Sequence, residues 1–468
     1  MLFTDSKFFI LVLITFVLFY LPVIRKMQSL VLIASSAVFY AYDQPYFLIL
    51  LLLSILINTT ASYHVFYKNT NNKLTMSLGV AFNLATLIFF KYSGLLAVTF
   101  SSDRTLIEQL ITIPLPVGIS FYTFQGISLL IDAFREKEMK LEQSEIIDPD
   151  IKSHFIKSFL FISFFPQLVA GPILKPNYFL VQIEEKFFKK INWEDVVKNL
   201  VLGYFFKIAI ADNLKEFTLF LDVPYAENFS AFTMMTLLFG YSFQIFADFA
   251  GYSFIAIGLA ELFGYTLIRN FEYPYIAKGF SEFWNRWHIS LYHWFNEYVF
   301  NPMNFKLRYW GKWGVVAGLF ITFSLSGIWH GASWNFAFWG IFHALLLIIE
   351  YKYSKKLKWK KWPKYLKMLI VFCSITISYL IFKIDSHHDL WRLIIHFWSN
   401  LHFKASIWNY EWYVAIYSLP IILYHLFFLL KEETKQQLNK LKPFLYALML
   451  ILIFNNAGSQ SDFIYFRF

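Results

Sequence analysis

Cysteine is almost absent from this chain, which has a single one, Cys373, among 468 residues. A lone cysteine forms no disulfide within the chain and gives no cysteine-based metal site. Charge is also scarce, because Asp, Glu, Lys and Arg make up 15% of the residues, against roughly 25% in soluble domains. No internal repeat, low-complexity tract or linker interrupts the sequence. We therefore expect one domain over residues 1–468 and exclude a disulfide-stabilised secreted scaffold.

Hydrophobic residues account for 58% of the chain, against roughly 45–50% in soluble domains. Apolar runs recur along the whole length, which predicts an all-α, polytopic membrane protein. The first run, residues 8–24, lacks a basic leader and a small-residue cleavage site, so it is predicted to be a transmembrane helix rather than a signal peptide. The net charge of +10 fits cytoplasmic loops rich in Lys and Arg, and no nucleic-acid partner is expected.

A bilayer-spanning helix needs about 20 mostly apolar residues. Several candidates are short or interrupted by Pro and Gly, as in ITIPLPVGISFYTF and FFPQLVAGPIL, and such backbone needs cover from protein or a water-filled cavity at membrane depth. With two or three re-entrant segments, we expect about ten or eleven spans, and an interfacial amphipathic segment at residues 175–199. The candidate spans are residues 8–24, 28–42, 46–62, 77–98, 113–131, 155–173, 231–247, 252–268, 315–329, 334–349, 366–382, 413–430 and 444–457.

The orientation follows from a loop at residues 352–367 that holds eight lysines and no acid. By the positive-inside rule this loop is cytoplasmic. Arg25 and Lys26 place the end of the first span on the same side. Alternation then puts residues 132–157 and 431–442 inside, and residues 383–412 and the C-terminal Phe468 outside.

Two histidines in aromatic, otherwise apolar segments are the candidate catalytic residues, because intramembrane ionisable groups mark functional sites. If residues 283–298 form one helix, His288 shares a face with Trp284 and Trp287, whereas Arg286 and His293 lie on another. A structural core histidine, bonded to backbone or hydroxyl groups, explains His288 equally well.

His330 lies in the sequence GIWHGASWN, where one apolar helix is predicted to end and the next to begin. The two glycines permit close backbone packing, and Trp329 and Trp334 flank the imidazole. A neutral imidazole can take a proton from an alcohol near neutral pH, although a histidine hydrogen-bonded at a helix break is the alternative. A metal would need a third ligand and a second shell, and His343 has no carboxylate near it in sequence. No metal is therefore expected.

Gln244, Asp248 and Tyr252 recur every four residues and form a polar stripe on a predicted membrane helix. A carboxylate there costs about 2.5–3.5 kcal/mol by insertion scales, so Asp248 needs a partner, for which Lys207 and Arg286 are the candidates. A buried structural network explains the stripe at least as well as a catalytic role. The candidate substrate-binding residues are therefore Trp329, Trp334, Asn335, Arg286, Asp248, Gln244 and Tyr252.

The segments FEYPYIAKGFSEFWNRWHISLYHWF and SGIWHGASWNFAFWG resemble the core of the membrane-bound O-acyltransferases (MBOAT). Within that family the likeness is greatest to the branch of alginate, peptidoglycan and other exopolysaccharide O-acetyltransferases. Further segments match that branch in the same order: SSAVFYAYDQPYFLILLLLS, PLPVGISFYTFQGISLLIDAFR, FISFFPQLVAGPIL, GYFFKIAIADN, FQIFADFAGYS and the C-terminal FIYFRF.

The resemblance implies a helical ring around a thinned centre, with a tunnel between the cytoplasmic and outer faces. It assigns the family's invariant histidine to His330 and its second histidine to His288, with an acyl thioester inside and a hydroxyl acceptor outside. The chain departs from the branch twice. NPMNFKLRYWGKW replaces the usual Pro-Leu-Gly-Gly-Asn-Arg turn, which predicts a different hold on the donor, and Phe254 stands where the branch has an Asp, which puts any role of that acid in question.

We therefore predict an O-acyltransferase of the bacterial inner membrane, with acetyl as the expected acyl group and an exported cell-envelope polysaccharide as the acceptor. His330 would be the general base, and His288 would bind or polarise the acyl group or orient the acceptor. No tightly bound cofactor is expected, because acetyl-CoA or an acyl carrier protein supplies the thioester as co-substrate.

The expected partners are the lipid bilayer, the glycan acceptor and an extracytoplasmic SGNH-type acetyltransferase or another polysaccharide-modification protein, which would complete the transfer in a relay. Three alternatives remain open. They are D-alanyl transfer from a carrier protein to teichoic acid, non-catalytic transport of an acyl donor or lipid-linked sugar, and a structural scaffold for polysaccharide export.

Overall fold

The computed structural model describes residues 1–68, 71–169, 171–384, 386–402, 404–406, 409–459 and 463; the expected outer position of Phe468 lies outside them. The regular secondary structure of the described residues is helical apart from one isolated bridge between Phe271 and Trp287, which confirms the all-α prediction. The chain forms two compact units, Met1–Leu200 with Ile255–Ile268, and Val201–Phe254 with Arg269–Phe468.

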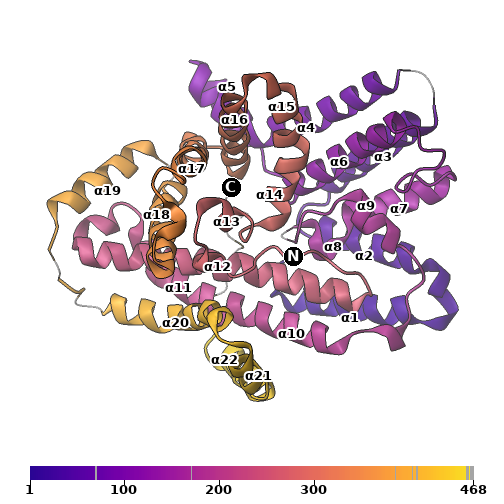
Figure 1. The fold of residues 1–468 in the computed structure, drawn as a ribbon. Helices are drawn as coiled ribbons and strands as arrows, with labels where there is room; N and C mark the ends of the chain where they lie inside the picture. Colours follow the sequence, from indigo (N-terminus) through magenta and orange to yellow (C-terminus); the bar gives the residue numbers. More distant parts are fainter. Residues whose placement is uncertain are drawn as a thin grey trace. The chain divides into compact units, whose positions relative to one another are not determined.

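The first unit contains the apolar helices of the N-terminal part of the chain. Residues 114–118 precede its helix α6 without being helical, and Phe164 separates α7 from α8, so both Pro- and Gly-containing stretches are interrupted as predicted. The elements are α1 (Ser6–Tyr20), η1 (Pro22–Met27), α2 (Gln28–Ala41), α3 (Phe47–Tyr67), α4 (Asn72–Phe100), α5 (Arg104–Ile111), α6 (Ile119–Glu138), α7 (Ile151–Ser163), α8 (Phe165–Leu168), α9 (Pro176–Phe179), η2 (Leu180–Gln182), η3 (Phe188–Lys190) and the first part of α10 (Trp193–Tyr204) (Figure 1).

A pair of buried asparagines joins α3 to α4. Asn83 Nδ2 donates to Asn58 Oδ1 at 2.7 Å, and Asn58 Nδ2 donates to Asn83 Oδ1 at 3.2 Å. Gly126 of α6 packs against the same amide, since a Cβ there would lie 2.5 Å from Asn58 Nδ2. Interhelical hydrogen bonds and small residues are the usual means of joining membrane helices.

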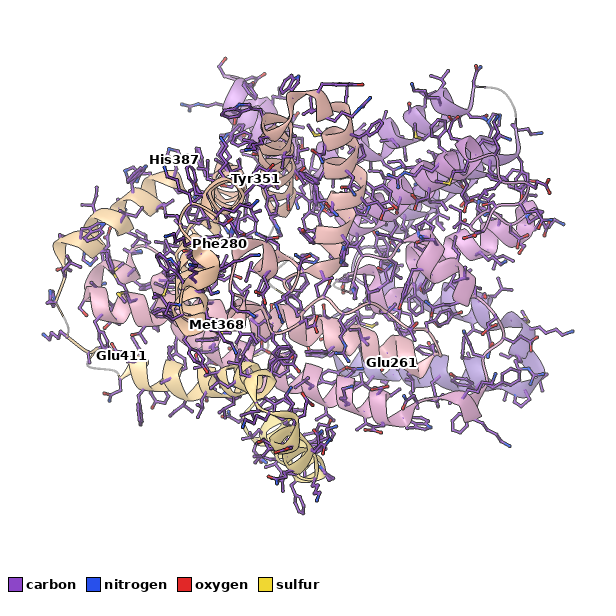
Figure 2. The ribbon with its side chains drawn as sticks, in the orientation of Figure 1. Glu261, Phe280, Tyr351, Met368, His387 and Glu411 are labelled. Atoms are coloured by element: carbon purple, nitrogen blue, oxygen red, sulfur yellow. The ribbon has the colours of Figure 1, made fainter. Side chains whose placement is uncertain are left out.

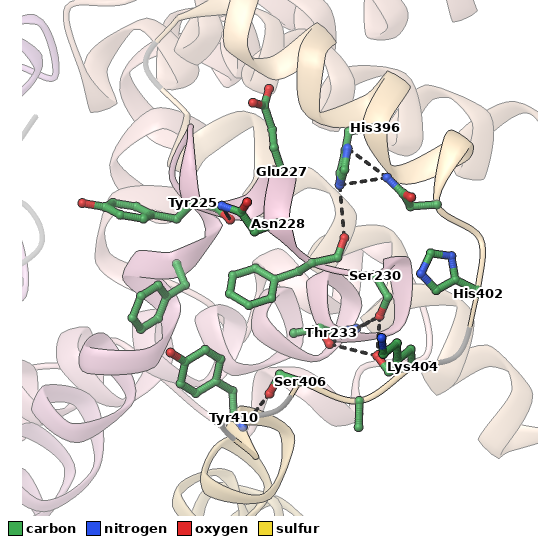
Figure 3. A pocket seen from close by; sticks show the side chains of 14 residues that line it. Tyr225, Glu227, Asn228, Ser230, Thr233, His396, His402, Lys404, Ser406 and Tyr410 are labelled. Carbon is green, nitrogen blue, oxygen red and sulfur yellow. Dashed lines mark hydrogen bonds between the residues drawn. The ribbon is translucent and has the colours of Figure 1, made fainter.

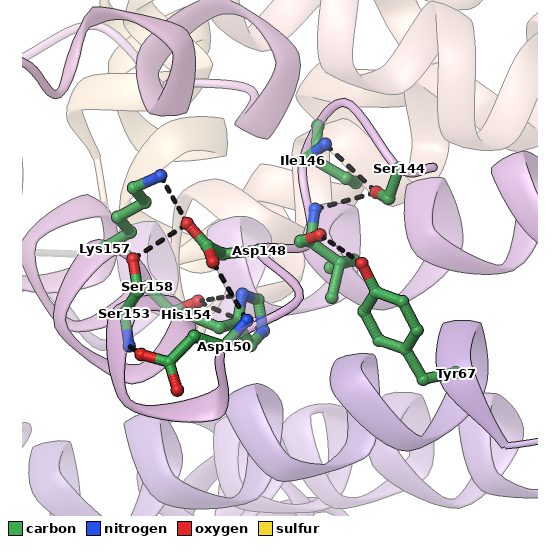
Figure 4. A network of polar contacts seen from close by, with 10 residues as sticks. Tyr67, Ser144, Ile146, Asp148, Asp150, Ser153, His154, Lys157 and Ser158 are labelled. Atoms are coloured by element: carbon green, nitrogen blue, oxygen red, sulfur yellow. Dashed lines mark hydrogen bonds and ion pairs between the residues drawn. The ribbon is translucent and has the colours of Figure 1, made fainter. Parts of the chain in front are cut away.

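The loop between α6 and α7 is held by a polar network around Asp148 (Figure 4). Asp148 Oδ2 accepts hydrogen bonds from Lys157 Nζ at 2.6 Å and from Ser153 Oγ at 2.8 Å, and Tyr67 OH donates to Ile147 O at 3.0 Å. Burial opposes ionisation of the Asp148 carboxyl, but the hydrogen bonds from Lys157 and Ser153 outweigh it and lower its pKa below the ordinary value. The loop therefore has a fixed conformation.

The second unit carries both candidate histidines. Figure 2 shows its side chains, with Phe280 at the start of α13, Tyr351 near the end of α17 and Met368 near the start of α18. Its elements are the end of α10, η4 (Phe205–Ala211), α11 (Asp212–Thr218), η5 (Leu219–Leu221), η6 (Tyr225–Asn228), α12 (Ala231–Leu262) as far as Phe254, η7 (Pro274–Ile276), α13 (Phe280–Trp284), α14 (Ile289–Phe295), η8 (Asn296–Phe300), α15 (Asn301–Lys306), η9 (Arg308–Trp310), α16 (Lys312–His330), α17 (Trp334–Tyr353), η10 (Trp359–Lys361), α18 (Lys364–Lys383), α19 (His387–Ser399), α20 (Tyr410–Leu429), α21 (Glu432–Asn439) and α22 (Lys442–Asn455).

Two of the expected spans, residues 231–247 and 252–268, are wrong as separate helices. The first lies within α12 and the second begins in it and runs past its end, while α12 itself is a continuous helix of 32 residues, about 48 Å long at 1.5 Å per residue. The helix stays continuous at the polar stripe because the Asp248 carboxylate is paired with Lys207. The negative charge of Asp248 therefore needs no helix break to reach water. The length of α12 exceeds the roughly 30 Å hydrocarbon core of a bilayer.

The single helix expected over residues 283–298 is also wrong. α13 ends at Trp284 and α14 begins at Ile289, and between them His288 has φ 45°, in the left-handed region. The sequence pattern missed this break because the aromatic spacing is helical on both sides of it. The break turns the chain so that His288 lies at the start of α14.

The segment between η7 and α16 begins and ends near the same end of the helix pair α16–α17, the end that holds the last residues of α17. At its start, Ser281 N donates to Glu350 Oε2 near the end of α17 at 2.8 Å. At its end, the Lys352 amine lies 3.8 Å from the ring centroid of Trp313. Between these points, α14, η8 and α15 run back along α16 toward its first residue (Figure 1). The segment is therefore a hairpin that begins and ends near the same end of the pair α16–α17, and neither of its parts was among the candidate spans.

By length and composition, eight described helices could cross a membrane, or nine if the bent pair α21–α22 counts as one span. The shorter apolar helix α1 comes in addition. The protein is thus a multi-pass membrane protein, while the expected ten or eleven spans, the helical ring and the tunnel stay predictions.

Candidate active site

α16 and α17 meet at a break that holds His330. α16 ends at this residue, and the hydroxyl of Ser333 caps α17 by accepting a hydrogen bond from Asn335 N at 3.3 Å. Before the break, the helices touch backbone to backbone, because a Cβ on Gly327 would lie 2.7 Å from Gly340 Cα. The glycines therefore set the close approach of the two helices, and the helix end predicted at His330 is confirmed.

Aromatic rings surround the His330 imidazole. The ring centroids of Trp329, Trp339 and Phe382 lie 5.1, 5.0 and 5.6 Å from that of His330. His330 is 2% exposed. These rings hold the imidazole in place and keep bulk water away from it, which strengthens any electrostatic interaction formed there.

His288 occupies a conformation that few residues other than glycine adopt. Its φ of 45° lies in the left-handed region, where non-glycine residues are uncommon and cluster at functional sites. Phe249 packs edge-on against its ring at 4.6 Å. The residue is 1% exposed, so its imidazole points into the protein interior and not toward solvent.

Asn270 stabilises the turn at His288. Its backbone carbonyl accepts from Ile289 N at 3.0 Å, and its side-chain oxygen accepts from Ser290 N at 3.2 Å and from Ser290 Oγ at 2.6 Å. Its Nδ2 donates in turn to Ser253 Oγ of α12 at 3.1 Å. Asn270 thus fixes the first turn of α14 and the conformation of His288.

Trp329 lies between the two histidines. Its ring centroid is 5.1 Å from that of His330 and 6.1 Å from that of His288. The two imidazoles, which are 42 positions apart in the sequence, therefore belong to one site. On the other side of Trp339, His343 lies 4.5 Å away ring to ring and its Nε2 is 3.1 Å from Ser378 Oγ, which fits a structural histidine.

A small cavity of about 80 Å³ adjoins this site between the hairpin before α16 and the pair α16–α17. Trp284, whose ring packs against Trp339 at 5.8 Å, lines it together with Thr322 of α16. Among the described residues, neither the Trp284 indole N–H nor the Thr322 hydroxyl has a hydrogen-bond partner. Both groups are available to a polar ligand that enters the cavity.

The polar stripe forms a buried ionic cluster. Lys207 Nζ lies 2.7 Å from Asp212 Oδ1 and 2.8 Å from Asp248 Oδ1, and all three side chains are buried. Lys207 belongs to the π-helix η4, and the Tyr252 ring centroid is 5.4 Å from its amine. Gln244 accepts a hydrogen bond from Thr218 Oγ1. The expected Lys207–Asp248 pair is confirmed, and the cluster has the character of a structural network.

The remaining predicted residues lie in different settings. Arg286 pairs with Glu282 at 3.0 Å. Of the two partners expected for Asp248, the structure therefore has Lys207 and not Arg286. Asn335 Nδ2 donates to Ile384 O and ties the start of α17 to the end of α18. Trp334 is 44% exposed. No group of three or more His, Cys, Asp or Glu side chains able to hold a metal ion occurs within the described part of the chain.

Comparison with known proteins gives the family. A sequence profile of MBOAT, the membrane-bound O-acyltransferase family, matches residues 34–384, which include both histidines and every candidate substrate-binding residue. The chain belongs to this family. It is therefore an O-acyltransferase and not a non-catalytic transporter or scaffold.

Individual relatives of this acyltransferase cover most of its length. The peptidoglycan O-acetyltransferase of Helicobacter pylori is 30% identical over 93% of the chain and 91% of its own length. The probable alginate O-acetylase AlgI of Pseudomonas aeruginosa is 28% identical over 84% of the chain and 74% of its own length. The teichoic acid D-alanyltransferase of Bacillus subtilis is 29% identical, over 58% of the chain and 69% of its own length.

The structure describes both points at which the acyltransferase departs from its branch. In the altered turn, the Arg308 guanidinium lies 4.2 Å from the Phe305 ring centroid and 4.4 Å from that of Tyr309. The exposed aromatic side chains of this turn are typical of a membrane interface. Phe254, in place of the acid, is buried and packs against Phe206 at 6.0 Å, so an apolar contact replaces a charge.

Sequence reasoning missed Trp339, Phe382, Phe249 and Asn270. The first three look like ordinary apolar helix residues, and only tertiary packing brings them to the imidazoles. Asn270 lies outside any regular helix, and its one signal was its place shortly before the FEYPY segment.

Proposed function

We propose that this acyltransferase moves an acyl group, acetyl first among the candidates, from a cytoplasmic thioester to hydroxyl groups of an exported cell-envelope polysaccharide in the bacterial inner membrane. The observation that carries the proposal is the pair His330 and His288, buried on either side of Trp329 in a chain of this family. Its relatives named for peptidoglycan and alginate acetylation support the choice of substrate class.

In the proposed reaction, the His330 imidazole accepts the proton of an acceptor hydroxyl. The oxygen attacks the thioester carbonyl, and the bond between carbonyl carbon and sulfur breaks. The thiolate leaves and takes up the proton from the imidazolium. General-base assistance of this kind is worth about 10²–10⁴-fold, and the aromatic surroundings of His330 keep competing water away.

His288 has a different role in this scheme. Its ring is fixed by Phe249 and by the Asn270-stabilised turn, so it binds or polarises the acyl carbonyl or orients the acceptor. The cavity beside Trp284 and Thr322 adjoins the same site and offers two hydrogen-bonding groups to the donor arm. Acetyl-CoA or an acyl carrier protein supplies the thioester, with no tightly bound cofactor.

The hydroxyl that reacts first belongs either to the glycan or to an intermediate acceptor. In a relay, an extracytoplasmic SGNH-type acetyltransferase or other polysaccharide-modification protein completes the transfer. D-Alanyl transfer to teichoic acid is the second candidate, favoured by the relative of that name, which matches 58% of this chain.

Mass spectrometry of envelope polymers from cells with and without the protein tests the proposal. Loss of O-acetyl groups from a polysaccharide supports it, and loss of D-alanine esters supports the second candidate. Unchanged ester content in every envelope polymer would contradict both.

A further inference from the structure

A second, larger pocket lies in the same unit, and neither His330 nor His288 lines it. Its volume is about 510 Å³, within the range of roughly 300–1,000 Å³ typical of ligand sites. Its walls come from η5, η6, the start of α12, the end of α19, residues 404–406 and the start of α20 (Figure 3). The proposed reaction makes no use of it.

Hydrogen bonds hold the walls of this pocket in place. Ser230 Oγ donates to Lys404 O at 2.5 Å, and Glu411 accepts from Ser406 N at 2.9 Å. His396 Nε2 lies 3.1 Å from Phe229 O across the pocket (Figure 3). Segments more than 160 positions apart in the sequence are thus joined, and the pocket is preformed.

Aromatic rings form one wall. Phe220 stacks on Tyr410, with ring centroids 4.8 Å apart and an interplanar angle of 16°, and Tyr225 packs edge-on against Phe220 at 5.9 Å. Tyr225 is 51% exposed. A flat aromatic surface with a polar hydroxyl, next to hydrogen-bonding groups, suits the apolar C–H face and the equatorial hydroxyls of a sugar ring.

Lys404 brings a positive charge to the rim of the pocket. Glu227 is paired with Arg392 at 2.7 Å, and the Glu411 carboxylate accepts hydrogen bonds from Thr233 and Ser406. The side chain of Lys404 is exposed, and none of the described acids forms an ion pair with it. The rim therefore offers an ammonium group to an anionic ligand.

The pocket lies at the end of α18 that is remote from the eight-lysine loop. α18 begins within that lysine-rich stretch, at Lys364, and at its other end Lys383 pairs with Asp222 at 2.9 Å. Phe382, at this same end, packs against His330, and Ile384 packs with Ala226 of η6. By the positive-inside rule this is the outer face. The pocket and His330 thus lie near the same end of α18.

We propose that this pocket binds pyranose rings of an anionic glycan, with Tyr225 against the ring face and Lys404 near a carboxylate. This inference rests on the proposed function, in which the acceptor polymer lies outside. A glycan held here is anchored near the end of α18 at which Phe382 packs against His330. The pocket then raises the local concentration of acceptor, or of the polymer that a relay partner modifies.

Equilibrium dialysis of the purified full-length protein in detergent tests this. The probes are end-labelled hexamers of mannuronate, a peptide-free hexasaccharide strand of peptidoglycan, and neutral chitohexaose. We expect at least one of the two acidic probes to bind more tightly than chitohexaose. Tyr225→Ala should weaken that binding about tenfold, and Lys404→Gln about two- to fivefold with a smaller dependence on salt.

The matched controls are Tyr365→Ala and Lys356→Gln, which change an exposed tyrosine and an exposed lysine in the region of the eight-lysine loop and should leave the affinity within about twofold. The inference is overturned if neither acidic probe binds, if chitohexaose binds equally well, or if Tyr225→Ala binds like the wild type. Thioester consumption, measured on the same preparation, separates the two proposals. If thioester consumption depends on His330 but no glycan binds, only the proposal about the pocket is refuted. If a glycan binds but no thioester is consumed, only the proposed acyl transfer is refuted.

Discussion

Replacing Lys207 with Met should destabilise the protein far more than replacing either of its acidic partners. The side chain of Lys207 is fully buried, and its amine lies 2.7 and 2.8 Å from two buried carboxylates. At an effective dielectric constant of about 20, each contact is worth roughly 6 kcal/mol before desolvation is counted. Lys207→Met leaves two carboxylates facing each other without this cation, and breaking a buried ion pair in this way costs about 3–5 kcal/mol.

The acidic partners behave differently because removing one of them leaves Lys207 paired with the other. Asp248→Asn leaves the Lys207 amine 2.7 Å from Asp212 Oδ1. We expect its cost to be about 1 kcal/mol, the size of a neutral hydrogen bond. Adding Asp212→Asn and Asp248→Asn to Lys207→Met should restore much of the lost stability, because the two carboxylates that Lys207 contacted are then neutral.

The midpoint of thermal unfolding, followed in detergent by the loss of soluble monomer, is measured for the wild type and the three variants. The expected order of midpoints is wild type, then Asp248→Asn, then the triple variant, with Lys207→Met lowest. A Lys207→Met protein as stable as Asp248→Asn would refute the assignment of a buried charge cluster.

Three further predictions follow from other parts of the molecule. Gly327→Val should abolish the close contact of α16 with α17 and sharply lower the yield of folded protein, whereas Gly94→Ala, whose nearest neighbour would be 3.4 Å away, should not; equal yields would contradict the packing. Because the pKa of Asp148 is lowered in the folded state, this carboxylate contributes to the free energy of unfolding above the ordinary pKa of 3.8, and the contribution is lost as the pH falls below that value. Between pH 7 and pH 3 the unfolding midpoint should therefore drop less for Asp148→Asn than for the wild type. With the single native cysteine replaced, an impermeant thiol reagent on intact cells should label a cysteine at Trp398 and not one at Lys358; the reverse pattern would invert the orientation.

The helix break at His330 could be predicted because GIWHGASWN places two glycines between two apolar runs. The Lys207–Asp248 pair followed from the cost of a lone carboxylate in a membrane helix. Both inferences use rules that act over a few residues or require a partner of opposite charge. The family resemblance reached further, because it covers the whole chain and assigned both histidines.

The rest depends on tertiary contacts that leave no periodic trace in the sequence. The left-handed conformation of His288 is set by Asn270, which lies before a stretch that otherwise appears helical. α12 was divided in two because its polar stripe resembles a boundary until the Lys207 pairing is known. The aromatic rings around His330 and the pocket beside α19 are assembled from segments far apart in the chain, so spacing alone did not bring them together.

The most direct test of the account is the turnover of His330→Gln beside that of His330→Ala. The substituted amide can hydrogen-bond but cannot accept a proton near neutral pH, so both variants should lose about 10²–10⁴-fold in acceptor-dependent thioester consumption. The unfolding midpoint of His330→Gln should stay close to the wild-type value, since loss of a neutral hydrogen bond costs only about 0.5–1.5 kcal/mol. His288→Gln should retain measurable activity if that ring only orients or polarises. A His330→Gln enzyme that turns over near the wild-type rate would contradict the general-base mechanism.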